Sequence, residues 1–420
     1  MSAPLRDTAG DAPTGGGDTL MGGGGSGRGG LSLRISGLYL ALYLHFGFFA
    51  FLPLWLARTG AEPGEIGVLM AIPLVLRLVT VAPFSAWAGR KGRVRDAIVV
   101  TALCSAALVA LLLSQPDHLG RVLIVVAFAI MWDQIPVLTD AYAVMAVRSH
   151  ALDFGRLRVW GSIGAVVSSM AAGWVFEATG ITALPLLVAT LLLLPALVAP
   201  LLPSDRRATE TSGSPVGSWR TVLHDRALVR LMIAAALVMA SHGVLTSFGA
   251  IGWSGRGVST GTIGLLQSVS VAAEIAAFWF GSRLLGSRDP GLLVWIAGIA
   301  AVLRWVVMAA DPSIAVLFAA QLFQGLTATG AILGVMLAIA RRVPMQSSAA
   351  AQGMNAVLLG LALSVTTAGS GLLWAHGAAV AYLAMAALAA LAAALAWPRR
   401  GRDAAVTGDP APSTALPQRS

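Results

Sequence analysis

The sequence predicts an all-α polytopic membrane protein with twelve transmembrane helices in two pseudo-symmetric six-helix bundles. Of its 420 residues, 57% are hydrophobic and only 11% are charged, against about a quarter charged in an average soluble domain. Twelve apolar runs supply the roughly 20 residues that a spanning helix needs, and a polar stretch divides them into six and six. The runs are continuously apolar, whereas membrane β-barrel strands alternate with a period of two.

The first six runs lie near 34–57, 66–89, 97–114, 121–147, 156–176 and 181–202, and the second six near 228–253, 262–282, 291–310, 313–340, 347–374 and 377–397. These runs predict a division of the chain into a disordered glycine-rich cytoplasmic head (1–31), an N-terminal bundle (32–202), a cytoplasmic central loop (203–227), a C-terminal bundle (228–397) and a disordered cytoplasmic tail (398–420). The first apolar run begins past residue 30, so no signal peptide is predicted.

The positions of the basic residues predict the orientation. Of 28 Arg and Lys residues, 23 fall on the side that carries both termini and three fall on the opposite side, namely Arg58, Arg121 and Arg256. Cytoplasmic loops carry such an excess, so we expect both termini in the cytoplasm of a bacterium and a multi-pass protein in its inner membrane. The net charge of +9 is then explained by topology and by contact with the lipid bilayer, and no nucleic-acid partner is expected.

The two halves repeat. An offset of 197 residues maps Ile66-Gly67-Val68-Leu69 onto Ile263-Gly264-Leu265-Leu266 and His45 onto His242, and it places Arg77 opposite Glu274. Transporters are often built from such repeats, with the binding site near the midplane between them.

Three charged residues within the spans are candidates for the mechanism, because a charge at the centre of a spanning helix costs at least about 2.5 kcal/mol. Glu274 and Arg77 each lie about 12 residues, or about 18 Å, into their spans. We expect Glu274 to exchange a proton and Arg77 and Arg304 to supply positive charge to Glu274 or to a substrate. The alternative is a permanent ion pair that only fixes helix register.

Span four carries two acids, Asp133 near the midplane and Asp140 nearer the cytoplasm. The short link to span five brings Asp140 towards Arg158, which predicts either a structural ion pair or cytoplasmic gate, or a direct contact with substrate. Asp133 is predicted as a second proton-coupling acid.

Polar uncharged side chains within the spans have two interpretations. His242 is a candidate proton relay beside Glu274, and His45 a candidate substrate ligand, although a buried histidine often only holds helices together. Gln267 and Gln324 are assigned to the substrate cavity, with helix packing as the alternative.

Several chemistries are excluded by missing patterns. The sequence has no phosphate-binding loop, no protease or hydrolase motif and no metal-ligand spacing, and its single cysteine, Cys104, allows no intramolecular disulfide. We expect no cofactor, no metal and no enzyme activity. A polytopic enzyme or a receptor, which would need a catalytic cluster or a folded cytoplasmic domain, is the rival outside transport.

The six-plus-six pattern and the basic turn after span two, with Gly89, Arg90, Lys91 and Arg93, resemble the major facilitator superfamily. The acid expected three residues before Gly89 is replaced by Ala86.

Further strings resemble the phenylpropionate permease branch of that superfamily, related to lactose and nucleoside proton symporters. They are Leu138-Thr139-Asp140-Ala141, the stretch 153–162, Ser241-His242-Gly243, Ala273-Glu274 and Arg304-Trp305. The resemblance implies a substrate and proton site at Asp140, Arg158, Glu274 and Arg304. The histidine and acid usual on span ten of lactose permease are absent.

The functional hypothesis is a monomeric secondary transporter that works by alternating access and imports a small organic acid, such as an aromatic carboxylate, together with a proton. The alternatives within transport are a sugar, oligosaccharide or nucleoside symporter and a drug efflux antiporter.

Overall fold

The computed structural model describes residues 24–150, 152–203, 219–284 and 288–397. This part of the chain contains no strand, and twelve of its helical stretches are long and apolar enough to cross a membrane. Each overlaps one predicted run, so the predicted fold class is confirmed. The stretches are Gly29–Arg58, Pro63–Arg90, Val94–Ser114, His118–Val147, Phe154–Thr179, Ile181–Leu201, Arg226–Gly255, Thr260–Gly281, Pro290–Ala309, Ile314–Arg342, Met345–Ala375 and Ala378–Ala396.

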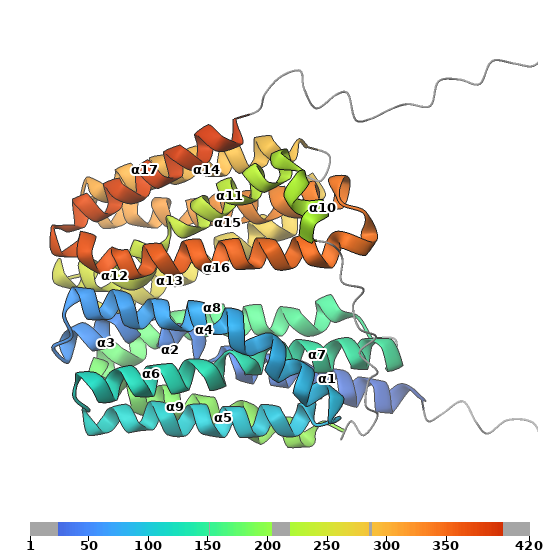
Figure 1. The fold of residues 1–420 in the computed structure, drawn as a ribbon. Helices are drawn as coiled ribbons and strands as arrows, with labels where there is room; N and C mark the ends of the chain where they lie inside the picture. The colour runs from blue at the N-terminus through green and yellow to red at the C-terminus, as the bar shows by residue number, and fades with distance from the viewer. Residues whose placement is uncertain (1–23, 151, 204–218, 285–287, 398–420) are drawn as a thin grey trace, which may run out of the picture.

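The helices form two groups that lie one above the other (Figure 1). The N-terminal group contains α1 (Gly24–Tyr43), α2 (Phe46–Phe49), α3 (Leu52–Arg58), α4 (Pro63–Arg90), α5 (Val94–Leu111), α6 (His118–Trp132), α7 (Gln134–His150), α8 (Phe154–Thr179) and α9 (Leu184–Val198). The C-terminal group contains α10 (Trp219–His224), α11 (Arg226–Ala240), α12 (Gly243–Gly255), α13 (Thr260–Leu284), α14 (Pro290–Ala309), α15 (Ile314–Arg342), α16 (Met345–Ala375) and α17 (Ala378–Ala396).

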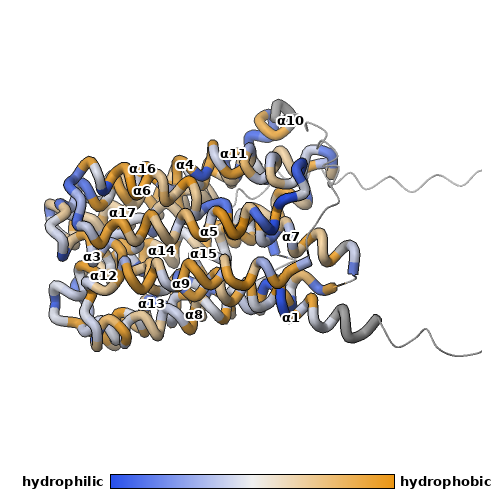
Figure 2. Tube along the Cα trace, turned by 90° about the horizontal axis from the view of Figure 1, so that it is seen from below, coloured by the Kyte–Doolittle hydropathy of each residue, from blue (hydrophilic) through white to orange (hydrophobic). Residues whose placement is uncertain are grey.

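The bundle has two ends, which we term the α10 end and the α3 end. The α10 end carries α10 and the first described turn of α1, and the α3 end carries α3 and the start of α4 (Figure 1). Hydrophobic residues run along the middle of the helices and hydrophilic residues gather at both ends (Figure 2). This distribution matches a bilayer, where the hydrocarbon core is about 30 Å thick and excludes unpaired polar groups.

Helix is present in part of the predicted head and in part of the predicted central loop. α1 begins at Gly24, inside the predicted head, and α10 lies inside the predicted central loop. Extending an existing helix needs no new nucleus, which explains how α1 continues into a glycine-rich segment. The remainder of the head, most of the loop and all of the tail lie outside the described residues.

The repeat extends to the ends of individual helices. α1 and α11 end at Tyr43 and Ala240, and α4 and α13 begin at Pro63 and Thr260, so both pairs are 197 residues apart. Spans one and seven are each interrupted at the repeat-matched histidine, because α2 begins after His45 and α12 after His242. The sequence predicted that the two histidines occupy equivalent positions, but it did not predict that the helices are interrupted there.

His242 stabilises the interruption in span seven. Its Nδ1 lies 3.0 Å from the carbonyl of Val238 and 3.2 Å from that of Met239, at the end of α11 where helix carbonyls lose their regular partners. The Met239 carbonyl also accepts from the His242 N–H, at 3.1 Å. The Ser241 hydroxyl also donates to Val238, at 2.6 Å. The side chains at the break therefore add hydrogen bonds to carbonyls whose regular helical partners are lost, as the absence of water from a bilayer requires.

The two groups meet along α4 with α16 and along α8 with α13. Small residues permit this approach, since a Cβ at Gly371 would overlap the Pro63 carbonyl and a Cβ at Gly173 would overlap that of Thr260. Hydrogen bonds across the interface include Arg58 to Ser254 at 3.1 Å and the Gly261 N–H to Glu177 at 3.0 Å. These contacts all lie at the α3 end.

Asp225 joins two helices at the α10 end. It caps α11 by accepting from the N–H groups of Ala227 and Leu228 at 3.1 and 3.0 Å, and Arg342 at the end of α15 donates to both its oxygens, at 2.8 and 3.0 Å. Partial burial raises the pKa of Asp225, but the hydrogen bonds from Arg342 and from these backbone groups outweigh burial and leave the pKa below its usual value.

We therefore expect the stabilisation supplied by the Asp225 charge to be present above the unfolded-state pKa of about 3.9 and to be lost as the pH falls through the lower folded-state pKa. Asp225→Asn keeps a capping oxygen and removes the charge, whereas Asp225→Ala removes both and should cost about 1 kcal/mol more. Thermal unfolding in detergent at pH 7 and pH 3 measures this, and a wild-type advantage over Asp225→Asn that is equal at both pH values would contradict it.

Candidate functional site

The side chains of Glu274 and Arg304 are bridged by the side-chain amide of Gln324, which forms a hydrogen bond with each of them. Arg304, on α14, is 1% exposed and donates from Nη1 to Oε1 of Gln324 at 2.5 Å and from Nη2 to Oε1 of Gln321 at 2.8 Å. Gln324, on α15, donates from Nε2 to Oε2 of Glu274, on α13, at 3.3 Å. The predicted partnership of Glu274 with Arg304 is thus mediated by Gln324, and within the described chain no ion pair joins the two charges directly.

The hydrogen-bonding capacity of these side chains fixes which atoms of the Gln324 amide face Arg304 and Glu274. A guanidinium has only donors, so Gln324 must present its carbonyl oxygen to Arg304 and its NH₂ to Glu274. Glu274 accepts this bond when ionised and keeps its second oxygen available for a proton. The acid can therefore change its protonation state while Arg304 keeps both amide partners.

A second layer of contacts holds Arg304 in place. Its guanidinium lies over the Trp305 ring, 4.8 Å from the centroid, and the Trp305 indole donates to Ser241 at 2.9 Å. His242 packs edge-on to Trp305 at 5.1 Å and lies 3.1 Å from the Thr327 hydroxyl through Nε2. Since Nδ1 faces two carbonyls and must carry a proton, a neutral ring accepts from Thr327 at Nε2. These partners of His242 are structural, and none of them is Glu274.

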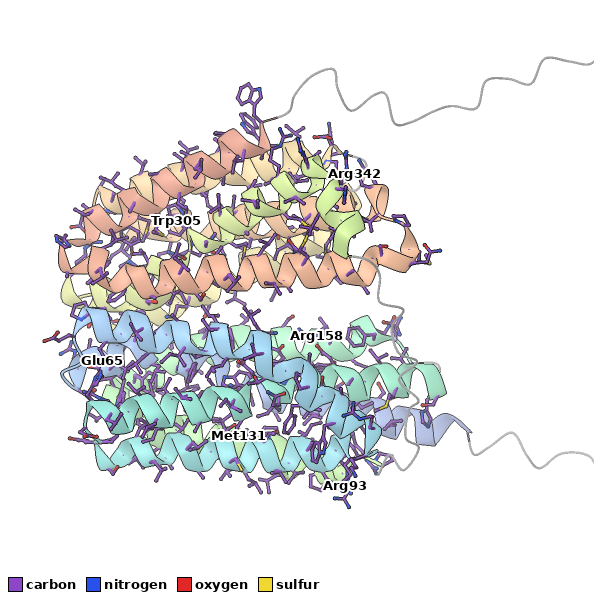
Figure 3. The ribbon with its side chains drawn as sticks, viewed as in Figure 1. Glu65, Arg93, Met131, Arg158, Trp305 and Arg342 are labelled. Atoms are coloured by element: carbon purple, nitrogen blue, oxygen red, sulfur yellow. The ribbon has the colours of Figure 1, made fainter. Side chains whose placement is uncertain are left out.

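A second polar cluster contains Asp140 and Arg158 near the α10 end. Nε of Arg158, on α8, lies 3.5 Å from Oδ1 of Asp140, on α7, and Tyr39 donates to the same oxygen at 2.7 Å. Arg158 also donates to the Tyr43 hydroxyl at 3.0 Å and lies 5.6 and 5.2 Å from the ring centroids of Tyr39 and Tyr43. The side chains of Arg158 and Asp140 remain 38% and 41% exposed, and Arg158 lies on the face towards the C-terminal group (Figure 3).

Asp133 separates α6 from α7 and so lies at a third helix interruption. Arg77, on α4, is close enough for its charge to act on Asp133, and the Arg77 side chain is exposed although it lies midway along its span. The structure thus places Arg77 with Asp133 in the N-terminal group, whereas the sequence left its partner open between Glu274 and the substrate. His45 is fully buried and lies edge-on to Trp132 at 4.7 Å, so it has no access to solvent in this conformation.

The remaining predicted residues have separate positions. Gln267 lies on α13, with a buried Oε1 that forms no hydrogen bond to the described residues.

The basic turn follows α4, which ends at Arg90 and is capped by Lys91. The Arg93 N–H donates to the Ala88 carbonyl at 3.1 Å, and the Gly89 carbonyl accepts from the Gly92 N–H. Gly92 has φ of 59°, a conformation that glycine adopts without strain, so it is the residue that closes this turn.

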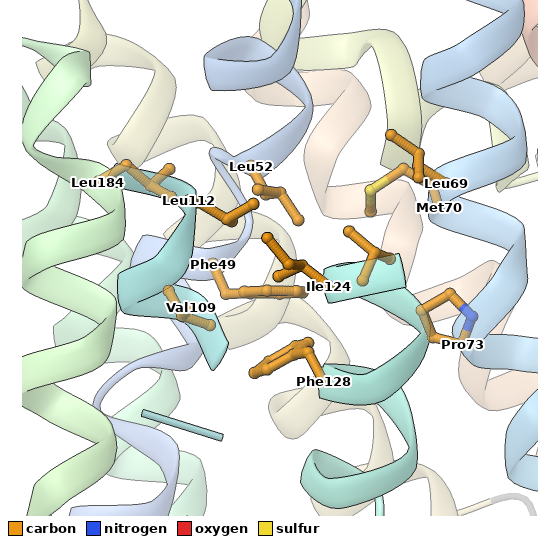
Figure 4. Close-up of a pocket in the computed structure, with 11 residues that line it drawn as sticks. Phe49, Leu52, Leu69, Met70, Pro73, Val109, Leu112, Ile124, Phe128 and Leu184 are labelled. Carbon is orange, nitrogen blue, oxygen red and sulfur yellow. The ribbon is translucent and has the colours of Figure 1, made fainter. Parts of the chain in front are cut away.

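An enclosed cavity inside the N-terminal group is too small for a substrate. It has a volume of about 20 Å³ and is lined by apolar side chains that include Phe49, Leu52 and Phe128 (Figure 4). A space of this size holds about one water molecule and stays dry without polar partners. It is a packing gap beside the α3 end.

Sequence reasoning did not single out Tyr39, Tyr43 or Thr327, and it named Trp305 only within the string Arg304-Trp305. A signal existed for the tyrosines, because the chain has only four and these two are four residues apart, on one helix face. No comparable signal marked Thr327 or the contacts that Trp305 makes, because these depend on which helix faces meet.

Two six-helix groups that repeat each other, with charged residues from several spans near the midplane, define the architecture of a secondary membrane transporter. The family model described as "MFS_1 like family" matches residues 32–384. The chain belongs to this family of major facilitator transporters and is a multi-pass inner-membrane protein.

Among curated relatives, the chain is 26% identical over 342 residues to the "Probable 3-phenylpropionic acid transporter" of Escherichia coli (strain K12), covering 80% of this chain and 90% of the relative. It is also 26% identical over 386 residues to the "Maltose permease" of Geobacillus stearothermophilus, covering 87% and 94%.

Solved structures share the fold. A mutant form of the nucleoside transporter NupG matches with a TM-score of 0.78 at 15% identity, over 87% of this chain and 98% of that chain. A bacterial homolog of the human lysosomal transporter Spinster, in an inward-facing and unoccupied conformation, matches with a TM-score of 0.72 at 15% identity, over 88% and 96%.

Proposed function

We propose that this protein is a proton-coupled symporter that imports a small aromatic carboxylate by alternating access. The observation that carries the proposal is the chain of hydrogen bonds from the partly buried Glu274 through the partly buried Gln324 to the buried Arg304. It holds a titratable acid beside a fixed positive charge without a direct ion pair, so the acid remains free to exchange a proton.

The conformation supports access from the α10 end. The contacts between the two groups at Arg58, Glu177, Gly173 and Gly371 lie at the α3 end, while Arg158 and Asp140 remain partly exposed nearer the α10 end. Most of the basic residues follow the spans at the α10 end, which the positive-inside rule assigns to the cytoplasm. We propose an inward-open state with both termini cytoplasmic.

The cluster around Arg158 fits an aromatic carboxylate. A guanidinium binds a carboxylate through two parallel hydrogen bonds, and the partly exposed ring of Tyr43 offers a surface on which an aromatic substrate can stack. Tyr39 is fully buried and holds Asp140 through its hydroxyl. Asp140 occupies Arg158 in this state and would have to release it. The relative named as a 3-phenylpropionic acid transporter supports the same substrate class.

Uptake into proteoliposomes, with and without an inward proton gradient, tests the proposal. Labelled 3-phenylpropionate, maltose and a nucleoside should be compared, and only the carboxylate should accumulate, and only with the gradient. Equal transport of the carboxylate without a gradient would contradict coupling.

We expect Arg158→Lys to reduce carboxylate uptake by at least about tenfold, because a lysine keeps the charge but loses the paired donors, and a hydrogen bond to a charged group is worth about 1.5–3 kcal/mol. Arg156→Lys is the matched control, since Arg156 lies two residues away, is 89% exposed and pairs only with Asp153 among the described residues. An equal loss in both variants would exclude a specific role for Arg158.

A sugar–proton symporter is the second candidate, favoured by the maltose permease relative and by the neutral amides Gln321 and Gln324 beside Arg304. Gradient-driven accumulation of maltose in the same assay would select it.

A further inference from the structure

A groove at the α10 end is separate from the polar clusters described above. It has a volume of about 240 Å³ and lies in the C-terminal group, between the end of α10, the first two turns of α11 and the last turn of α17. Its lining consists of Leu223, Arg226, Val229, Arg230, Ile233 and Leu395. Two arginines in an otherwise apolar lining indicate an amphipathic ligand.

Both arginines have uncompensated charges. Arg226 and Arg230 are four residues apart, on one face of α11, where like charges repel. Within the described part of the chain neither side chain forms an ion pair or a hydrogen bond, and the adjacent acid, Asp225, is already bound by Arg342 and by the N–H groups of α11. The N-terminal end of α11 adds the positive end of its helix dipole. An anion placed between the two guanidinium groups would relieve this repulsion.

The groove changes from charged to apolar with depth in the membrane. Arg226 is the first residue of the seventh span, and at 1.5 Å per residue Arg230 lies about 6 Å deeper and Ile233 about 10 Å deeper. Trp397, 59% exposed, follows Leu395 at the same end, and tryptophan prefers the boundary between headgroups and hydrocarbon. The arginines are therefore at headgroup level, and Val229 and Ile233 are at the level of the acyl chains.

We propose that this groove binds one anionic phospholipid, with its phosphate between Arg226 and Arg230 and an acyl chain along Val229 and Ile233. Basic pockets between membrane helices bind lipid headgroups in this way. Inorganic phosphate would use the arginines but would leave the apolar part of the groove exposed. The length of the apolar lining therefore favours a lipid over a soluble anion.

Native mass spectrometry of the purified full-length protein, with added phosphatidylglycerol or phosphatidylcholine, tests the proposal. We expect one phosphatidylglycerol to be retained preferentially by the wild type. The double variant Arg226→Gln/Arg230→Gln should bind it about 25-fold more weakly, because each basic residue near a membrane surface contributes roughly fivefold to the attraction of anionic lipid. Arg156→Gln/Arg288→Gln is the matched control, since both residues are exposed and neither lines the groove.

A second measurement separates the lipid from free phosphate and from misfolding. Thermal unfolding should show a higher midpoint with phosphatidylglycerol than with phosphatidylcholine for the wild type and the control, and no such difference for the groove variant. The variant should unfold like the wild type in phosphatidylcholine, which excludes general damage. Equal lipid retention by both double variants, or the same stabilisation by inorganic phosphate alone, would overturn the proposal.

Discussion

Replacement of Glu274 by glutamine is expected to abolish concentrative uptake while leaving the exchange of substrate across the membrane intact. Glutamine has nearly the same shape and still accepts the hydrogen bond from Gln324, which lies 3.3 Å from Glu274, so the hydrogen bonds that connect this position to Arg304 should persist. It cannot release a proton, and the proton gradient then has no means of driving the substrate.

The expected size of the effect follows from the gradient. A difference of one pH unit is worth about 1.4 kcal/mol per proton, which supports about tenfold accumulation for one proton per substrate. The wild type should approach this ratio in proteoliposomes, and Glu274→Gln should stop at equal concentrations. Glu62→Gln, an exposed acid before α4, is the control and should accumulate normally. Concentrative uptake by Glu274→Gln would remove Glu274 from the proton step.

The second large effect is expected from a single methyl group at the α3 end. A Cβ at Gly371 would overlap the Pro63 carbonyl, so Gly371→Ala should force α16 away from α4. Overpacking of this kind costs about 1–3 kcal/mol, which shifts a two-state equilibrium about 5- to 150-fold. The state in which the α3 end is closed would be depopulated, and transport would slow.

Gly369 provides a matched control on the same helix, because a Cβ there would meet nothing within 4 Å. Spin labels at Thr59→Cys and Gly255→Cys, in a Cys104→Ser background, report the separation of the two groups at the α3 end. We expect a longer distance for Gly371→Ala and an unchanged distance for Gly369→Ala. The same distance in both variants would mean that the interface tolerates the methyl group.

The twelve spans could be predicted because apolar length and charge placement act locally along the chain. The interruptions at His45 and His242 could not, since the spans are predominantly apolar on both sides and a lone histidine, even beside Ser241 and Gly243, does not by itself end a helix. The break in span seven depends on side chains that replace lost backbone partners, such as Ser241 and His242 with the Val238 carbonyl. These contacts follow from tertiary packing.

The candidate site was predictable as a set of residues but not as a network. Buried charge marked Glu274 and Arg304 individually, and nothing in the spacing indicated that Gln324 would lie between them. That position depends on how α13, α14 and α15 are rotated about their axes. Successive residues of a helix point about 100° apart, so a shift of one residue along a helix turns a side chain towards a different neighbour. The same uncertainty explains why Arg77, given no definite partner by the sequence, lies with Asp133.

The matched helix ends carry a consequence for the history of the chain. Because the ends of α1 and α11 and the starts of α4 and α13 keep one constant spacing, insertions and deletions have left no net trace between them since the two halves diverged. A residue added within α4 or α13 would turn the later side chains of that helix by about 100°, so the equal spacing keeps Arg77 and Glu274 at matched positions on the two helices. One repeat-matched position thus carries opposite charges in the two halves, Arg77 in the first and Glu274 in the second.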